Sequence, residues 1–249
     1  MPDKLVTNGL VLRATETKEA DYILTVLTAE HGRLAVIARG ARRRSSKLSA
    51  ACQHLAFSEL VLYRRGNWHY LDEASTLTLF DGLRADIEKL SLASYFAEMT
   101  EAVTTEDMPA GEVLSLLLNA LYALDSLDRP NELVRAAFEL RLLALSGYEP
   151  LLDDCAMCGR TDPNEPTFDA AQGVVLCKEC AGPSGGVLLD AGALAAMRHI
   201  IGAPPKRLLS FTLEPPSLAR LNAACEAFAA VQLERRFKTL DFYKSIKLT

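Results

Sequence analysis

The sequence has few of the features that mark a membrane protein or an enzyme. None of its apolar runs approaches the roughly 18 residues that span a bilayer. Its start has neither a charged region leading into an apolar stretch nor a small-residue cleavage site. A phosphate-binding G-x-x-x-x-G-K-[ST] loop and an H-E-x-x-H motif are both missing. We therefore expect a cytoplasmic protein that is not an enzyme.

One stretch, residues 182–186, matches the G-x-S-x-G pattern of serine hydrolases around Ser184. It follows a cysteine pair rather than a strand, and Pro183 precedes the serine, so the strained strand-to-helix turn of such enzymes is not expected. The four histidines, at positions 31, 54, 69 and 199, form no visible cluster with carboxylates. We predict no catalytic residue.

What the sequence does contain indicates a folded chain with an uneven charge distribution. Hydrophobic residues make up 49% of the 249 residues, enough for a sizeable core, and the length favours two domains. The net charge is −5, but residues 1–80 hold eleven Lys and Arg against eight Asp and Glu. The rest holds sixteen against twenty-four. An anionic partner is therefore expected at the first third of the chain.

The first 80 or so residues read as strands separated by short Gly-containing turns. The segments rich in Val, Leu, Ile, Thr and Tyr are 5–13, 21–28, 33–39, 56–65 and 69–80. Five strands without helical periods between most of them predict a small closed β-barrel over residues 1–81, an OB-fold or an SH3-like barrel.

A helical period begins at Leu83 and continues to the end of the sequence. Leucine stripes predict three helices that pack as a bundle, around residues 87–97, 114–124 and 133–140. Residues 189–201 and 215–246 read as further helices. The prediction is an α+β protein whose helical domain, residues 82–249, carries an inserted segment at about 153–183.

That insertion contains the most specific motif of the chain, two Cys-x-x-Cys pairs. Cys155, Cys158, Cys177 and Cys180 have the spacing of a zinc site. Four thiolates saturate one tetrahedral Zn²⁺ and leave no open position for a substrate or water, so we expect a structural zinc. The residues between Cys155 and Cys180 hold two cations against four acids, which argues against direct contact with nucleic acid.

A second motif, ARGARRRSSKLS at 38–49, is a basic loop. It contains Arg39, Arg42, Arg43, Arg44 and Lys47 without an acid between them. Guanidinium groups suit phosphate oxygens, so this loop is predicted to bind a nucleic acid backbone. A solvated basic loop is the simpler alternative.

A third motif, YRRGNWHY at 63–70, mixes cations and aromatic residues. Arg64, Arg65, Trp68 and Tyr70 are candidates for phosphate contacts and base stacking on a single strand. For Trp68, packing in the core is an equally good reading.

The end of the sequence carries Arg235, Arg236 and Lys238 among aromatic residues. These cations suit a helix C-terminus, an acidic or amphipathic peptide, or an extended DNA path. We include them as candidates for a second DNA-binding surface.

The order of these segments resembles the RecO family of bacterial DNA repair proteins. The similarity rests on GLVLR, on DYILTVLT with EHGRLAVIARGARRRSSKL, on FSELVLYRRGNWHYLDEAS, on GLRADIEKLSLASYFAEM and on the cysteine pairs. It covers nearly the whole chain, and the cysteine pairs match the zinc-bearing members.

This resemblance implies an OB-fold and a helical domain with a zinc finger. It also implies a recombination mediator of the RecF pathway that binds single- and double-stranded DNA and anneals complementary strands. The implied partners are RecR and the single-strand binding protein. The resemblance further implies that the protein helps RecA to load onto DNA that is coated by the single-strand binding protein. The alternative is an RNA-binding OB-fold protein with a zinc finger.

Overall fold

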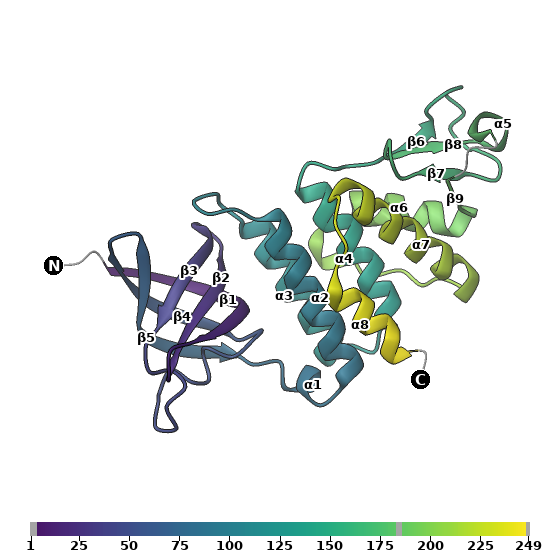
Figure 1. The fold of residues 1–249 in the computed structure, drawn as a ribbon. Coiled ribbons are helices and arrows are strands. Elements are labelled where there is room, and N and C mark those ends of the chain that lie inside the picture. The colour runs from purple at the N-terminus through teal and green to yellow at the C-terminus, as the bar shows by residue number, and fades with distance from the viewer. Residues whose placement is uncertain (1–3, 183–185, 248–249) are drawn as a thin grey trace. The chain divides into compact units, whose positions relative to one another are not determined.

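A computed structural model describes residues 4–182 and 186–247 (Figure 1). Ser184 of the G-x-S-x-G match lies outside these residues. The chain forms two compact units, one of residues 1–127 with 237–249 and one of residues 128–236. This grouping differs from the predicted domain boundary after residue 81. That boundary was placed where strands change to helices, and it stays a prediction.

Five strands form a closed barrel in the first unit. They are β1 (Lys4–Thr17), β2 (Asp21–Thr28), β3 (Gly32–Ala38), β4 (Phe57–Arg65) and β5 (Trp68–Thr78). The strand order is β1-β2-β3-β5-β4, with β1 also paired to β4 and with β3 parallel to β5. This order is that of an OB-fold, so the predicted barrel is confirmed and the SH3-like alternative falls away.

The barrel core follows from alternation along the strands. In β3 every second residue is buried, from Gly32 through Leu34 and Val36 to Ala38. The same cluster contains buried Leu and Val side chains of the other four strands. In β1, Gly9 lies where a Cβ atom would come within 2.4 Å of the Val26 side chain. A side chain at position 9 would therefore push β1 and β2 apart.

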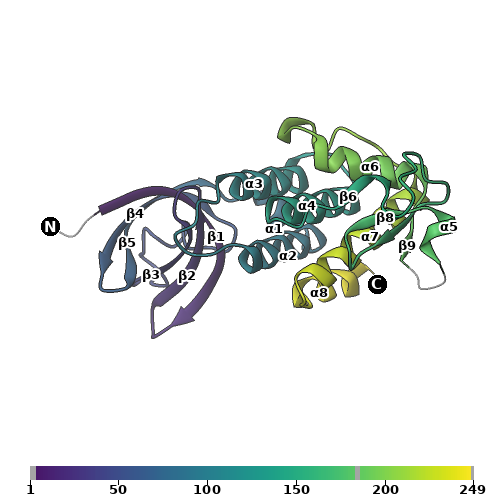
Figure 2. The ribbon, with the colours of Figure 1, turned by 90° about the horizontal axis from the view of Figure 1, so that it is seen from above.

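Four helices complete the first unit. They are α1 (Asp81–Arg84), α2 (Ile87–Val103), α3 (Gly111–Ser126) and α8 (Lys238–Lys247). The Asp86 carboxylate accepts hydrogen bonds from the backbone N–H groups of Glu88 and Lys89 and so caps the start of α2. α8 lies alongside α2 in both Figure 1 and Figure 2. The Phe237 ring contacts the Tyr95 ring edge-on, with centroids 5.4 Å apart.

The barrel is fastened to the loop between α2 and α3. The Arg33 N–H donates to the Thr105 carbonyl at 3.0 Å, and the Arg33 guanidinium donates to the Glu101 carbonyl at 2.6 Å. On β1, Arg13 forms an ion pair of 2.8 Å with the Glu101 carboxylate. The β2–β3 turn and the α2–α3 loop therefore act as one rigid junction.

The second unit surrounds a small sheet with helices. Its elements are α4 (Asn131–Leu145), β6 (Leu151–Cys155), β7 (Thr167–Asp169), β8 (Val174–Leu176), α5 (Lys178–Ala181), β9 (Val187–Leu188), α6 (Ala191–Gly202), the 3-10 turn η1 (Pro205–Arg207) and α7 (Pro215–Gln232). The sheet has the order β6-β8-β7-β9. Helix α4 packs against α6 and α7, and Cys225 of α7 is fully buried, as expected of a core residue.

One helical prediction stays untested and another is wrong. Of the three leucine-rich helices, α2 and α3 belong to the first unit and α4 to the second, so their packing as one bundle stays a prediction. A leucine stripe determines which face of a helix is buried but not which helix covers it. The predicted helix at 215–246 is interrupted between Gln232 and Lys238. Glu234 has a φ of 49°, outside the right-handed helical region, and the chain turns so that Phe237 is buried.

Candidate nucleic-acid interface and metal centre

An aromatic row crosses the outside of the barrel. Lys4 of β1 pairs with Tyr63 of β4, Tyr63 pairs with Tyr70 of β5, and Tyr70 pairs with Ile37 of β3. The two tyrosine rings are stacked, with centroids 5.3 Å apart and planes 15° from parallel. The Arg39 guanidinium carbon lies 4.7 Å from the centre of the Tyr70 ring. Two predicted residues, Arg39 and Tyr70, are thus brought together.

Tyr63 is the member of this row that the sequence prediction missed. Its signal was available, because a two-residue Gly66–Asn67 turn places residues 65 and 68 opposite each other. Counting back two more positions along each strand then pairs Tyr63 with Tyr70 on the same face. The combination of stacked rings and a guanidinium is what single-stranded nucleic acid binding uses.

Besides Arg39, the basic loop after β3 holds one anchored cation and three cations without an ion pair in the part of the chain that the structure describes. Arg42 forms an ion pair of 2.6 Å with Glu16 and lies 5.9 Å from the centre of the Tyr22 ring. Its backbone N–H donates to the Ala20 carbonyl at 3.0 Å, so Arg42 anchors the loop to the β1–β2 turn. The other three cations of the loop, Arg43, Arg44 and Lys47, are exposed, and none has an ion pair within the described residues.

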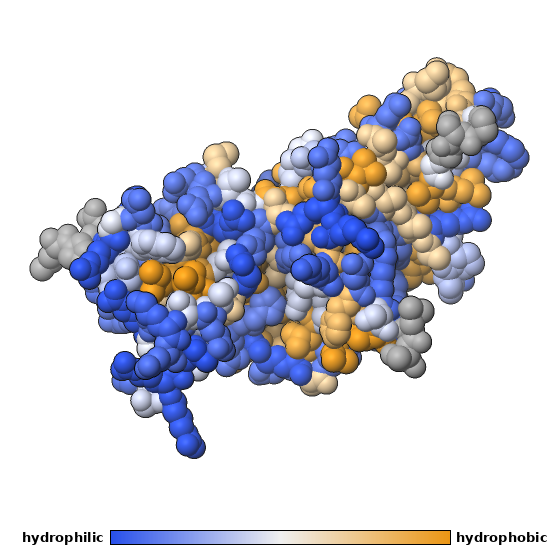
Figure 3. Space-filling model, viewed as in Figure 1, coloured by the Kyte–Doolittle hydropathy of each residue, from blue (hydrophilic) through white to orange (hydrophobic). Residues whose placement is uncertain are grey.

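Arg64, Arg65 and Trp68 lie at the tip of the β4–β5 hairpin. The Arg64 Nε–H donates to the Gly66 carbonyl across the turn at 3.3 Å, and Arg65 pairs with Trp68 in register. Trp68 is 43% exposed, so it is not a core residue and its ring is available for stacking. Hydrophilic residues cover most of the barrel surface visible in Figure 3.

The predicted C-terminal cations lie in two different units. Arg235 and Arg236 follow α7 in the second unit, outside any helix, whereas Lys238 begins α8 in the first unit. Lys238 borders a shallow apolar groove of about 410 Å³ with Ile87 and Phe242, which appears as a hydrophobic area in Figure 3. The three residues therefore do not form one basic helix.

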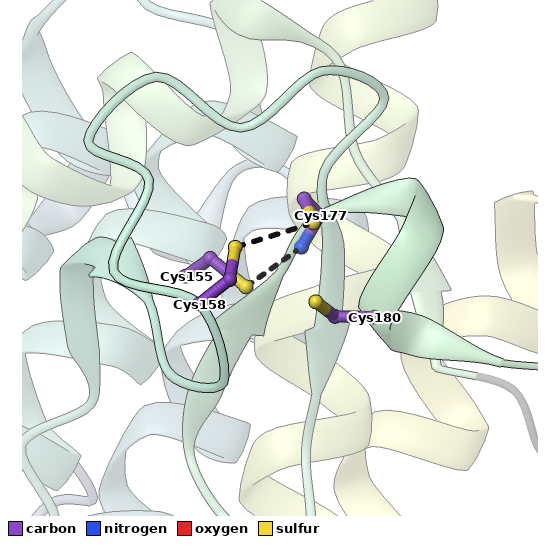
Figure 4. A group of neighbouring side chains, drawn as sticks. All are labelled: Cys155, Cys158, Cys177 and Cys180. Atoms are coloured by element: carbon purple, nitrogen blue, oxygen red, sulfur yellow. Dashed lines mark hydrogen bonds between the residues drawn. The ribbon is translucent and has the colours of Figure 1, made fainter.

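The four cysteines of the second unit converge on a single point. Their sulfur atoms all lie within 4.8 Å of one another, and Figure 4 shows them pointing toward a common centre. The Cys158 and Cys177 sulfurs are 3.8 Å apart, close to the edge of a tetrahedron built on Zn–S bonds of about 2.3 Å. The predicted ligand set is thus assembled, and its donor type and geometry fit a tetrahedral metal ion.

Each cysteine pair forms a tight turn held by backbone hydrogen bonds. In the first, Gly159 has a φ of 71° and its N–H donates to the Cys155 carbonyl at 2.8 Å. In the second, the Cys180 N–H donates to the Cys177 carbonyl at 3.0 Å. The Cys177 N–H points to the Cys155 sulfur at 3.3 Å and joins the two turns (Figure 4).

The pKa values of Cys155 and Cys180 are shifted in opposite directions. Removal from water raises the pKa of Cys155, but hydrogen bonds from the backbone of Cys177, Cys158 and Met157 outweigh it and lower the pKa to about 6. The neighbouring Cys177 thiol, followed by burial, raises the pKa of Cys180 to about 12. A second thiolate beside the first is costly unless a cation lies between them, which is what a bound metal ion supplies.

An arginine outside the motif supports the first turn. The Arg198 side chain, from α6, donates to the carbonyls of Leu152 at 2.9 Å and Asp153 at 2.7 Å. It also reaches the Thr161 carbonyl at 3.3 Å. The residues that receive these bonds lie on both sides of Cys155 and Cys158. Arg198 was missed by the sequence prediction, because nothing in its helical neighbourhood distinguishes it from a surface cation.

The metal segment offers few cations to a polyanion. Arg160 pairs with Glu179 at 3.2 Å, and Lys178 pairs with Glu165 at 2.9 Å. Both cations between the outer cysteines are therefore already neutralised by acids of the same segment, in agreement with a role in holding the chain rather than in contacting phosphates.

Comparison with known proteins identifies the family to which this chain belongs. Residues 1–80 match the family model for the N-terminal part of recombination protein O, and residues 84–241 match the model for its C-terminal part. The chain belongs to the RecO family. The family assignment confirms the resemblance seen in the sequence and makes this a DNA repair protein of the RecO type.

Curated members of the RecO family align along nearly the whole chain. The DNA repair protein RecO of Acetivibrio thermocellus is 33% identical over 244 residues, which cover 97% of both proteins. That of Anaeromyxobacter sp. strain K is 33% identical and covers 98% of this chain and 97% of its own. That of Symbiobacterium thermophilum is 30% identical over 96% of each. Among the described residues, no helix combines the length and apolar character needed to cross a membrane.

Proposed function

We propose that this protein is a recombination mediator of the RecF pathway. It binds single- and double-stranded DNA, anneals complementary strands, and acts with RecR to help RecA load onto DNA coated by single-strand binding protein. None of these steps requires covalent chemistry, so the proposal needs no catalytic residue. Residues 1–81 are the proposed DNA-binding domain, and residues 82–249 the helical domain with its zinc finger.

The observation that carries this proposal is the stacked Tyr63–Tyr70 pair with Arg39 above it, on the same barrel as the exposed cations Arg43, Arg44 and Lys47. Aromatic rings hold bases by stacking, and exposed cations release counterions from phosphates. Annealing also needs a surface for a second strand. Lys238, and Arg235 with Arg236, are the candidates for it.

We further propose that the four cysteines hold one structural Zn²⁺. The separation of the sulfurs and the supporting hydrogen bonds favour this ion, and four thiolates leave it no free coordination position. The ion would join the turn after β6 to the turn after β8, which are otherwise connected mainly through a four-stranded sheet whose strands β7 and β8 have only three residues each.

An annealing assay tests the proposed function. Two complementary oligonucleotides, one labelled with a donor and one with an acceptor dye, are mixed with the protein, with and without a single-strand binding protein. The expected result is faster duplex formation in both cases. Spontaneous rates in both cases would remove the mediator proposal.

The RNA-binding alternative is tested by affinity. A single-stranded DNA and an RNA of the same base sequence are compared by fluorescence anisotropy at one salt concentration. Equal or tighter binding of DNA is expected, because stacking and phosphate contacts do not require a 2′-hydroxyl. A strong preference for RNA would favour the alternative.

A further inference from the structure

A polar cavity lies at the end of the barrel, next to the exposed Trp68. Its volume is about 260 Å³. Its polar lining comes from three separate segments: Arg64, Asn67 and His69 of the β4–β5 hairpin, His31 of the β2–β3 turn, and Glu106 with Asp107 of the α2–α3 loop. The apolar side chains of Leu5 and Leu34 also line it. The cavity is smaller than the roughly 300–1,000 Å³ of pockets for drug-sized ligands, so it suits one small planar group.

The cavity is held open by a rigid frame. Gly32 forms a backbone bridge with Glu106, and the Asp107 N–H donates to the His31 carbonyl at 3.2 Å. Gly32 has a φ of 61°, and a Cβ atom there would come within 2.4 Å of two carbonyl oxygens of the α2–α3 loop. The close approach of the two segments therefore depends on glycine, and it fixes where the acids and histidines point.

Most of the hydrogen-bonding capacity in the cavity is unused. Within the described residues, the side chains of His31, Asn67, His69, Glu106 and Asp107 make no hydrogen bond and no ion pair. Burial, and then the nearby Arg64, lower the pKa of His69, so its ring is neutral near pH 7 and has one donor and one acceptor nitrogen. Donors and acceptors from three segments thus face one space without protein partners.

The charge of the cavity restricts its ligand. Two carboxylates face one guanidinium, so a phosphate is disfavoured. A metal ion held by three or more of these groups is also disfavoured, because among the described residues only the four cysteines bring such ligand atoms together. A neutral group that presents both donors and acceptors remains. Because the cavity adjoins the hairpin with Trp68 and Arg65, a base of a bound single strand is such a group.

We propose that this cavity binds one unpaired guanine base of a single strand, an assignment that rests on the proposed DNA binding and adds a base preference to it. The Glu106 or Asp107 carboxylate accepts from the guanine N1–H and its amino group, which are adjacent donors. Arg64 and Asn67 donate to O6. Thymine has a single ring N–H and no amino group, so it leaves a carboxylate oxygen without a partner.

The test compares oligothymidylates of one length that differ at a single central position. That position carries dG, deoxyinosine or dT, and affinities are measured by fluorescence anisotropy at fixed salt. The protein is expected to bind the dG strand roughly tenfold more tightly than the dT strand, in line with the discrimination of one good base contact. Deoxyinosine, which lacks the amino group, is expected to lie between them.

The matching variant is Glu106→Gln with Asp107→Asn, which keeps the shape of both side chains. Asparagine tolerates the φ of 59° at position 107, so the loop is expected to fold and the melting transition to persist. The dG preference should disappear, while binding of the dT strand should stay equal or tighten through the lost negative charge. Glu30→Gln, an exposed acid of the β2–β3 turn that does not line the cavity, is the control and should keep the preference.

Three results would overturn the inference in distinguishable ways. Equal affinity of the wild-type protein for the dG and dT strands, with salt-dependent binding of both, removes the guanine site and leaves the proposed function standing. Binding of neither strand removes both. A preference for dG that survives in the Glu106→Gln, Asp107→Asn variant places base recognition elsewhere and also rejects this cavity.

Discussion

The metal segment and the outer face of the barrel assemble their functional groups over very different distances along the chain. Each half of the metal site is a four-residue motif, Cys155–Cys158 or Cys177–Cys180, closed by its own backbone hydrogen bonds. The aromatic row instead joins Lys4, Tyr63, Tyr70 and Ile37 from four strands. The cysteine ligands can therefore be recognised from their spacing in the sequence. The aromatic row forms only when the strands pair in the observed register.

The same contrast explains what each region tolerates. The proposed metal site depends on a few ligands, and losing them is expected to remove the ion altogether. The barrel face spreads its binding over several cations and rings, so single substitutions are expected to weaken binding by degrees. Variants of the two regions should therefore behave differently.

Replacing Cys155 and Cys158 with alanine is expected to have the largest effect. Losing the metal should lower the free energy of unfolding of the second unit by about 3 kcal/mol or more. DNA affinity of the barrel should be unchanged at temperatures where the barrel stays folded. Calorimetry with and without a chelator, together with anisotropy, measures both.

Met157→Ala is the control for that pair, because Met157 lies between the two cysteines and is 74% exposed. It should leave the melting transition where it is. A cysteine variant that loses DNA affinity while its melting is unchanged would reverse the assignment of roles.

Reversing the charge of Arg43 and Arg44 to glutamate should weaken single-strand binding by about 100-fold at low salt and flatten the salt dependence. Lys206→Glu with Arg207→Glu, an exposed adjacent pair in η1 of the second unit, is the matched control. If both double variants lower affinity equally, the barrel loop has no special role and only net charge matters.

Substituting Arg198 with alanine should lower metal affinity about tenfold, because residues that orient a metal site typically contribute 10–100-fold. Competition with a chromophoric chelator gives the affinity. Arg220→Ala removes an arginine of α7 that donates to the Leu189 carbonyl at 3.3 Å and does not touch the cysteine turns. Unchanged metal affinity in the Arg198 variant would show that the two cysteine turns keep their geometry without Arg198.

The smallest effect is expected from His54, near the junction of barrel and α2. Burial, and then Arg84, lower the pKa of His54, whose Nε2 lies 3.1 Å from the Ser94 hydroxyl. A lowered histidine pKa favours the neutral form in the fold, so the stability it contributes is present above the ordinary pKa of about 6.5 and is lost as the pH falls through the lower folded value.

Urea unfolding from about pH 7.5 down to about pH 5 measures this loss. The stability of the wild-type first unit should fall more steeply than that of His54→Gln, which cannot titrate at that position. Parallel pH profiles would mean that other groups account for the acid sensitivity.

The strands and the ligand set of the metal were predictable because both are local patterns. Alternation and turn residues located β1 to β5 within a few positions, and spacing identified all four cysteines. The stacked tyrosines were not found, although hairpin counting allowed it. Arg39 above Tyr70 was beyond such counting, because it depends on the parallel pairing of β3 with β5.

The sequence also did not show which helices pack against each other. The stripe of α4 indicated a buried face, but its neighbours α6 and α7 come later in the chain, with the metal segment between. The break after Gln232 has no glycine or proline to mark it. Burial of Phe237 against Tyr95 decides it, and this contact joins residues 142 positions apart.

The return of α8 to α2 has a consequence for synthesis of the protein. The barrel and α2 leave the ribosome early, but Phe237, Leu240 and Tyr243 are made only after the whole second unit has been translated. Until then part of the apolar face of α2 lacks its cover. The first unit to be translated is thus the last to be completed, and for that interval α2 presents a surface to chaperones or to other nascent chains.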